Sequence, residues 1–216
     1  MLLDLGRSLL SLVALAALLS AGCAPISVSR GRGSLPRTDD RFLVGGTVFI
    51  EESHTEAILP TIGGQMTRPL NDWLLLGIDF GVMSARPFLS VPFSIGRFHT
   101  DLTIGAQGGM AVDAIFGGVD ASAGLSYGDE DFEIYSALRH QQLWISLPEH
   151  HYDADDTYLG ATTPEYHWQT WAGFLGYRAR RHGIEAYVMP LPAERTERDE
   201  DAIIYGLNLH WTTGGD

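Results

Sequence analysis

The chain has little cysteine, no lysine and only one long apolar run. Its 216 residues include a single cysteine, Cys23, so no intrachain disulfide can form. All 14 basic residues are arginines, and 27 acidic residues outnumber them to give a formal net charge of -13. Nucleic-acid binding depends on a basic surface, because the partner is a polyanion. The composition therefore argues against a nucleic-acid partner.

The apolar run lies at the start of the chain. It extends from Leu9 to Leu19, is interrupted at Ser11, and follows Arg7. A transmembrane helix needs about 20 apolar residues, so this run is too short to span a bilayer. A basic residue, a short apolar stretch and then small residues are typical of a secretory signal peptide. We expect residues 1–22 to be a signal peptide that directs export.

The residues around Cys23 predict a lipid anchor. The LSAGC sequence that ends at Cys23 resembles the lipobox of bacterial lipoproteins. The resemblance implies cleavage before Cys23, diacylglycerol on its thiol and an acyl chain such as palmitate on its new amino group. Ala24 follows in place of Asp, which in enteric lipoproteins implies sorting to the outer membrane. The alternative is ordinary cleavage nearby, for example after Ala24, with no lipid on Cys23.

A segment of different composition follows the lipobox. Between Cys23 and Arg41 the sequence is rich in Ser, Gly, Pro and Arg and has no apolar periodicity. Such a segment buries too little apolar surface to fold alone. We expect residues 23–40 to be a lipidated cysteine with a flexible tether, and residues 41–213 to form one β-barrel domain.

The body of the chain shows alternation with a period of two and no helical stripe. This alternation is typical of strands with one apolar face. The intervening positions hold mainly Gly, Ser, Gln and scattered Asp. The apolar positions are clearest in four segments: Leu74, Leu76, Ile78, Phe80 and Val82; Leu102, Ile104, Ala106, Gly108, Met110 and Val112; Ile115, Val119, Ala121, Ala123, Leu125 and Tyr127; and Ile203, Tyr205, Leu207, Leu209 and Trp211.

The residues between the apolar positions favour a barrel in lipid over a sheet in water. A water-facing sheet surface is usually rich in charge and in Thr, whereas small polar residues fit the interior of a narrow closed barrel. The five tryptophans lie mostly toward strand ends, as in the aromatic girdles of membrane barrels. We predict an all-β, antiparallel, up-and-down barrel of about ten strands, with 8 to 12 compatible with the pattern. The alternative is a soluble barrel or sandwich on a lipid tether, with its apolar faces inward.

The expected strands and connections predict a topology. An even strand number returns the C-terminus to the periplasmic side, where an N-terminal lipid would lie, and the connections 148–164 and 192–200 then lie outside the cell. The RHQQ sequence at 139–142 offers an alternative turn that would split one strand. The expected strands are 42–51, 56–66, 73–84, 87–97, 100–110, 114–127, 131–147, 165–180, 183–191 and 201–212.

The end of the chain adds a second resemblance. The YGLNLHW sequence at 205–211 resembles the C-terminal assembly signal of bacterial outer-membrane β-barrels. That family normally stops at its final aromatic residue, whereas here residues 212–216 follow. The resemblance implies an outer-membrane location.

One loop concentrates residues that bind metals. Oxygen ligands in a flexible loop suit Ca²⁺, and imidazoles suit Zn²⁺. The spacing matches no EF-hand or zinc signature, so a hydrated acidic loop is the favoured interpretation and weak Ca²⁺ or Mg²⁺ binding the alternative. We expect no other cofactor. The candidate ligands, in the loop 148–165, are His150, His151, Asp153, Asp155 and Asp156.

The sequence predicts no catalytic residue. His99 with Asp101, and Ser136 with His140, have the spacing of neighbours on one face, yet no GxSxG motif accompanies them. The favoured function is a lipid-anchored outer-membrane barrel with a structural or surface-interaction role. Its expected partners are outer-membrane lipid, lipopolysaccharide and other envelope proteins. A small channel or a lipid-modifying enzyme is the alternative.

Overall fold

The computed structural model describes Ser34 and residues 40–51, 54–81, 84–111, 114–146, 149–152, 158–162, 165–191 and 202–212. In this part of the chain, no helix is long and apolar enough to cross a membrane. The strands are β1 (Asp40–Glu51), β2 (His54–Asn71), β3 (Leu74–Gly81), β4 (Ser84–Ile95), β5 (Phe98–Ala111), β6 (Ala114–Gly128), β7 (Phe132–Ser146), β8 (Glu149–Tyr152), β9 (Tyr158–Thr162), β10 (Glu165–Ala179), β11 (His182–Leu191) and β12 (Ala202–Thr212).

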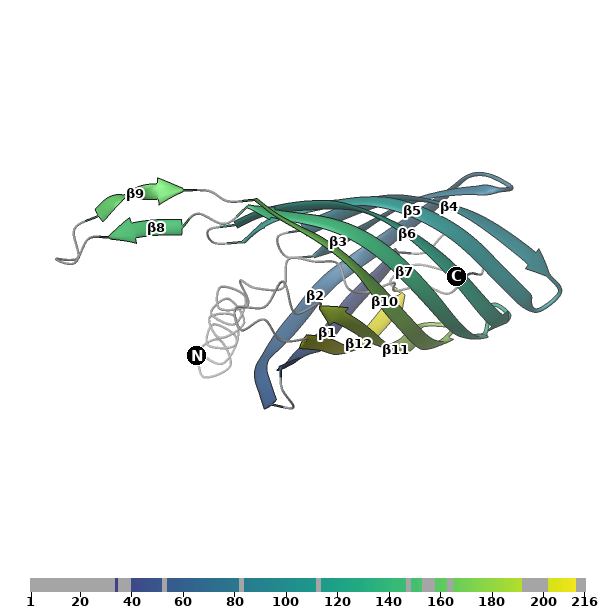
Figure 1. Cartoon of the computed structure of the whole chain (residues 1–216). Coiled ribbons are helices and arrows are strands. Elements are labelled where there is room, and N and C mark those ends of the chain that lie inside the picture. The colour runs from purple at the N-terminus through teal and green to yellow at the C-terminus, as the bar shows by residue number, and fades with distance from the viewer. Residues whose placement is uncertain are drawn as a thin grey trace, which may run out of the picture.

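Ten of these strands form a closed antiparallel barrel (Figure 1). Their order is β1-β12-β11-β10-β7-β6-β5-β4-β3-β2, so each strand pairs with its neighbours along the chain, and β1 pairs with β12 to close the barrel. β8 and β9 form a separate two-stranded sheet between β7 and β10. The prediction of an up-and-down barrel of about ten strands is confirmed.

The two ends of the barrel differ in their connections. The turns at residues 72–73, 96–97, 129–131 and 180–181 all lie at one end, here named the short-turn end. The β8–β9 hairpin extends beyond the opposite end, here named the hairpin end (Figure 1). The two longest connections, between β7 and β10 and between β11 and β12, are both at the hairpin end, and long connections at one end are typical of membrane barrels.

β2 is longer than the sequence predicts. It continues past residue 66 to Asn71, and the turn occupies residues 72–73. Pro69 and Asn71 resemble turn residues in the sequence, and Pro69 has no N–H to donate to a neighbouring strand. The structure places a register shift between Pro69 and Asn71, which lets the strand continue through the proline.

β7 is not split. The RHQQ segment at 139–142 pairs continuously with β6 and with β10, so the alternative turn is wrong. Arg139 and Gln141 are buried inside the barrel, whereas His140 points outward and stacks on Trp171 with ring centroids 4.7 Å apart. Each face of this polar segment therefore has a partner.

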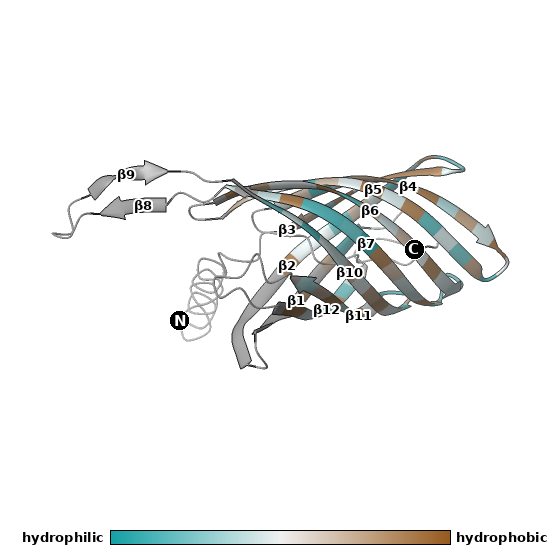
Figure 2. Ribbon diagram, in the orientation of Figure 1, coloured by the Kyte–Doolittle hydropathy of each residue, from teal (hydrophilic) through white to brown (hydrophobic). Residues whose placement is uncertain are grey.

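The apolar face of the strands points outward. Ile78, Ile104 and Leu207 are exposed on the outer surface, and the polar residues between the apolar positions are buried in the lumen. Figure 2 shows the resulting alternation of hydrophobic and hydrophilic residues, most clearly along β4, β5, β6 and β7. The alternative of a soluble barrel with these apolar faces inward is wrong.

The expected acidic loop contains secondary structure. Its backbone forms the β8–β9 hairpin, with Glu149 paired to Thr162 and a register shift at Tyr152. The prediction of a loop over residues 148–164 is therefore wrong for this part of the chain. The segment is too short for its period to identify strands in the sequence.

Candidate functional site

The lumen of the barrel contains a network of buried polar side chains. Four arginines and five carboxylates are among its buried residues, so most of their charge is compensated inside the barrel. Buried ions need such partners, because each loses its hydration on leaving water. The charged members are Arg41, Asp79, Arg86, Asp101, Asp120, Glu133, Arg139, Arg178 and Glu185.

Arg86 is the centre of the largest ion-pair cluster. Its Nη1 donates to Asp79 Oδ2 at 2.7 Å, and its Nε and Nη2 donate to the two oxygens of Asp120 at 2.7 Å and 2.5 Å. Gln65 also donates to Asp79, at 2.5 Å. A bidentate guanidinium–carboxylate pair is among the stronger hydrogen-bonded contacts in proteins. The cluster ties β2, β3, β4 and β6 together through the lumen.

Gly105 provides the space for this cluster. Arg86 lies on β4 and Asp120 on β6, and Gly105 on β5 is the direct neighbour of Asp120. A Cβ on Gly105 would come within 2.9 Å of Arg86 Nη2, so any side chain there would meet the guanidinium. Glycine at this position lets Arg86 cross β5 and reach Asp120.

A second group fills the middle of the lumen. Gln107 Nε2 donates to Gln141 Oε1 at 3.2 Å, and Gln141 Nε2 donates to Met189 Sδ at 2.8 Å. The Arg139 guanidinium lies 4.9 Å from the centroid of the Phe174 ring, a cation–π distance, and 3.9 Å from Asp120. Arg139 is 2% exposed and Met189 is 0% exposed. Side chains from β5, β7, β10 and β11 therefore pack against one another inside the barrel at this level.

A third group lies nearer the short-turn end. The Tyr135 hydroxyl donates to Glu185 Oε2 at 3.1 Å and lies 3.4 Å from His210 Nε2. Arg178 Nη2 lies 2.8 Å from Glu133 Oε2 on the neighbouring strand. Tyr135 reaches β11 by passing over Gly176 on β10, where an added Cβ would meet the tyrosine ring.

One residue of the segment before β1 also lies in the lumen. Ser34 is fully buried, its hydroxyl donates to Asp101 Oδ1 at 2.5 Å, and its backbone N–H donates to Ser126 Oγ at 3.3 Å. Asp101 accepts further hydrogen bonds from Ser90 at 3.2 Å and Thr103 at 2.7 Å. This polar cluster fixes Ser34 against β5 and β6.

Most of the candidate ligands and the candidate lipid site lie outside the part of the chain that the structure describes. Cys23 lies outside the described residues, as do Asp153, Asp155 and Asp156 and the side chains of His150 and His151. Within the part that the structure describes, no three His, Cys, Asp or Glu residues are placed to hold a metal ion.

The two pairs considered for catalysis lie on different faces. Ser136 and His140 point outward from β7, while His99 and Asp101 point into the lumen from β5. His99 contacts Ser94 and the Gly128 carbonyl, whereas Asp101 binds the serine and threonine hydroxyls.

The sequence does not predict the arginine network. Arg86 meets Asp79 across the β3–β4 hairpin, but its pairing with Asp120 and the pairings of Arg139 and Arg178 join residues farther apart along the chain and depend on the barrel register. One feature of the sequence could have identified these arginines. An arginine at an inward position, in a strand where apolar and polar residues alternate, requires a carboxylate partner inside the barrel.

Comparison with known proteins identifies similar folds only. No family model matches the chain, and no curated protein matches it. Among solved structures, the N-terminal β-barrel domain of Pseudomonas aeruginosa OprF is 10% identical, with a TM-score of 0.33 over 81% of this chain and 98% of that chain. The outer-membrane protease OmpT from Escherichia coli is 12% identical, with a TM-score of 0.43 over 82% and 97%. Neisserial surface protein A is 9% identical, with a TM-score of 0.35 over 80% and 94%. With TM-scores below 0.5, these similarities do not bear on function.

Proposed function

We propose that this chain is a lipid-anchored β-barrel of the bacterial outer membrane, with a closed lumen and a structural or surface-interaction role. One observation carries the proposal: the barrel exposes its large apolar side chains and buries its charges. In water, a protein of this size would bury the apolar residues instead. In lipid, the apolar outer face contacts acyl chains, and the backbone N–H and C=O groups form hydrogen bonds between neighbouring strands of the closed barrel.

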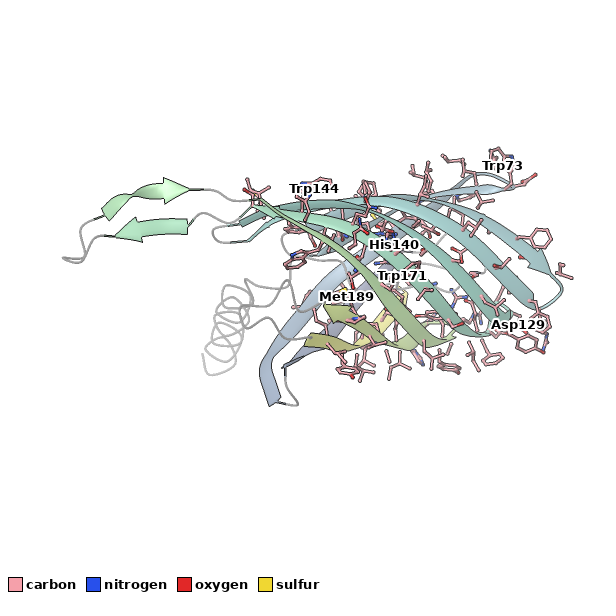
Figure 3. The ribbon with its side chains drawn as sticks, in the orientation of Figure 1. Trp73, Asp129, His140, Trp144, Trp171 and Met189 are labelled. Atoms are coloured by element: carbon pink, nitrogen blue, oxygen red, sulfur yellow. The ribbon has the colours of Figure 1, made fainter. Side chains whose placement is uncertain are left out.

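Aromatic residues at the short-turn end support the membrane position. Trp73, Phe93, Phe98, Tyr127 and Trp211 are all exposed near this end. Figure 3 shows Trp73 and Asp129 at the short-turn end and Trp144 toward the other end. Aromatic side chains at both ends of an apolar belt are typical of barrels at the membrane–water interface. We assign the short-turn end to the periplasm and the hairpin end to the cell surface.

The filled lumen supports a role other than an open pore. Arg139, Gln141 and Met189 are each 2% exposed or less at mid-barrel. Small barrels fill their interior with side chains, whereas water-filled channels need many more strands. We expect no steady open conductance in planar bilayers, and a stable open channel would favour the alternative function of a small pore.

Integration into the membrane is tested by removing the lipid site. The Cys23→Ala variant should stay in the outer-membrane fraction after a urea wash and should migrate differently in gels before and after heating, because the folded barrel holds itself in lipid. A tethered domain would become soluble after the same substitution. Recovery of Cys23→Ala in the soluble fraction contradicts the barrel proposal.

The lipid anchor has a separate test. Labelled palmitate should enter the wild-type protein in a bacterial host and should not enter Cys23→Ala. Equal labelling of both proteins contradicts lipidation and leaves the barrel proposal unaffected. The partners proposed for the assembled protein are outer-membrane lipid, lipopolysaccharide and other envelope proteins.

A further inference from the structure

Ser94 and His99 form a hydrogen-bonded pair at the short-turn end of the barrel. They are direct partners across the β4–β5 hairpin, whose turn is formed by Gly96 and Arg97. Gly96 has a φ of 60°, a left-handed conformation that glycine adopts without strain. The hydroxyl of Ser94 lies 2.8 Å from His99 Nδ1. Ser94 is exposed, whereas His99 is 4% exposed.

The second ring nitrogen of His99 fixes the direction of this hydrogen bond. His99 Nε2 lies 3.2 Å from the carbonyl oxygen of Gly128. A carbonyl oxygen only accepts hydrogen bonds, so Nε2 carries the proton and donates it. In the neutral ring, Nδ1 is then the unprotonated nitrogen, and it accepts the hydrogen bond from Ser94. This is the arrangement of a base that can take the serine proton.

The carbonyl that orients His99 is itself held in place. The Gly128 N–H donates to the Arg97 carbonyl oxygen at 2.9 Å, and Arg97 Nη2 lies 3.1 Å from Asp129 Oδ2. These contacts join the β4–β5 turn to the β6–β7 turn. A nucleophile, a base and a group that orients the base are the three parts of an activated serine.

We propose that Ser94 and His99 form a catalytic pair that hydrolyses acyl esters. Ser94 Oγ attacks the ester carbonyl while His99 Nδ1 takes its proton, and the same proton passes to the leaving alcohol. Water then attacks the acyl–serine ester, again giving its proton to His99, and releases the fatty acid and free Ser94. One ester and one water give one acid and one alcohol, with no other reactant.

The pair lies at the rim of the barrel, next to the apolar outer face, so the substrate class chosen for the test is an ester with a long acyl chain, as in membrane glycerophospholipids. Phe93, Ile95 and Phe98 are 60%, 67% and 60% exposed on the outer face of these two strands, whereas Ser94 and His99 lie on the inner face at the rim. The Phe98 and Tyr127 rings lie 4.9 Å apart. Arg97, in the β4–β5 turn, pairs with Asp129 and keeps an exposed guanidinium that a phosphate group could also contact. The choice of substrate rests on the proposed membrane position, whereas the serine chemistry does not.

A serine-reactive fluorophosphonate probe tests the pair in detergent-solubilised full-length protein. Folding is verified first by the gel shift on heating, so failure to form a barrel is seen separately. Wild type should be labelled, and peptide mass spectrometry should locate the label on Ser94. Ser94→Ala should lose the label, while Ser136→Ala, which removes another exposed serine, should keep it. An unlabelled folded wild type, or a label that persists in Ser94→Ala, overturns the proposal.

The role of His99 is tested with a variant that keeps its structural contact. In His99→Gln the side-chain amide can still donate to the Gly128 carbonyl but cannot act as a base. The labelling rate should fall by about 100-fold or more, the usual contribution of a general base, with the gel shift unchanged. A folded His99→Gln variant that reacts at the wild-type rate shows that His99 only joins the two turns.

The substrate class is tested with two esters on the wild-type protein. Phospholipid in mixed micelles should release fatty acid faster than a short water-soluble ester such as p-nitrophenyl acetate is cleaved, and Ser94→Ala should abolish the release. Cleavage of the short ester alone overturns the lipid substrate. Cleavage of neither overturns the proposed activity.

Discussion

The inner and outer faces of the same ten strands have opposite chemistry. On β5, Asp101, Thr103 and Gln107 are buried, while Leu102 and Ile104 between them are exposed. Adjacent residues on a strand point to opposite faces, so one sequence builds both surfaces. The inner face is held together by hydrogen bonds and ion pairs between side chains, whereas most large apolar side chains on the outer face are exposed and depend on the solvent around them.

The two faces therefore have different roles: the inner face determines how the strands are arranged, and the outer face determines where the barrel lies in the membrane. The inner face fixes which strands lie across from one another, because Arg86 must meet both Asp79 and Asp120. The outer face needs only apolar bulk at the right depth, since lipid is not a specific partner. The effect of an inner-face substitution on stability should therefore depend on which partner is lost. The effect of an outer-face substitution should depend on its depth in the bilayer.

Arg86→Met should have the largest effect. It leaves two buried carboxylates without their main cation, and breaking such a pair costs about 3–5 kcal/mol. Urea unfolding of the reconstituted protein measures the loss of unfolding free energy. Arg68→Met is the matched control, because Arg68 pairs with Asp40 at the exposed end of the barrel, and it should leave the unfolding free energy unchanged. Equal unfolding curves for the two variants would show that the lumen network does not stabilise the barrel.

Ile104→Arg should have the next largest effect. Ile104 lies in the middle of β5 on the outer face, where an arginine at mid-bilayer costs about 2–4 kcal/mol. Ile95→Arg, at the end of β4, should cost only about 0–1 kcal/mol, because the interface tolerates charge. The same unfolding assay in lipid compares them. Two exposed isoleucines that tolerate arginine equally would indicate that both face water.

Gly105→Ala should cost about 1–3 kcal/mol, the usual penalty for overpacking. The new methyl would meet the Arg86 guanidinium, which two carboxylates hold in place. Gly173→Ala is the control, since its Cβ would lie 3.6 Å from Val188 Cγ1 at ordinary contact distance. The loss of unfolding free energy caused by Gly105→Ala should be smaller in the Arg86→Met background. An equal loss in both backgrounds would show that the new methyl group does not clash with Arg86.

The acidic hairpin connection should show the smallest effect. The alternative to a hydrated acidic loop is weak Ca²⁺ binding, with an affinity near 10⁻⁴ to 10⁻³ M, as in extracellular sites. Calorimetry on the wild type should detect this weak binding, and changing Asp153, Asp155 and Asp156 to Asn should abolish it. Binding that survives the three substitutions would locate the cation elsewhere. An epitope tag after Ala154 should be reached by antibody on intact cells, and detection only after permeabilisation would reverse the assigned orientation.

The alternation of residues was sufficient to predict the architecture. Period two predicted the two alternating sets on β5, β6 and β12, because the period does not depend on which strands pair, and the small polar residues between the apolar positions predicted that the apolar set faces outward. The long β2 and the β8–β9 hairpin were not predicted. Proline and asparagine in β2 resemble turn residues, and the hairpin strands are too short to show a period.

The contacts of the lumen and of the rim could not be predicted in the same way. Tyr135 reaches Glu185 only because Gly176 lies between them, which requires the register of three strands. Ser94 and His99 were not paired in the sequence because that pairing depends on a two-residue turn at Gly96 and Arg97. A hairpin turn with glycine between strands was the signal that could have identified the pair.

The position of the outer face in lipid has a direct test by spin labelling. Cys23→Ala removes the only thiol of the chain, so single cysteines can then carry a label at Leu102, Ile104 and Ala106 on the outer face, with Arg97 in the turn as the aqueous reference. In liposomes, the three outer labels should collide with oxygen in preference to a water-soluble nickel complex, most strongly at mid-strand, while the label at Arg97 should show the reverse. Preference for the nickel complex at all four positions would contradict the account, because the outer face would then lie in water.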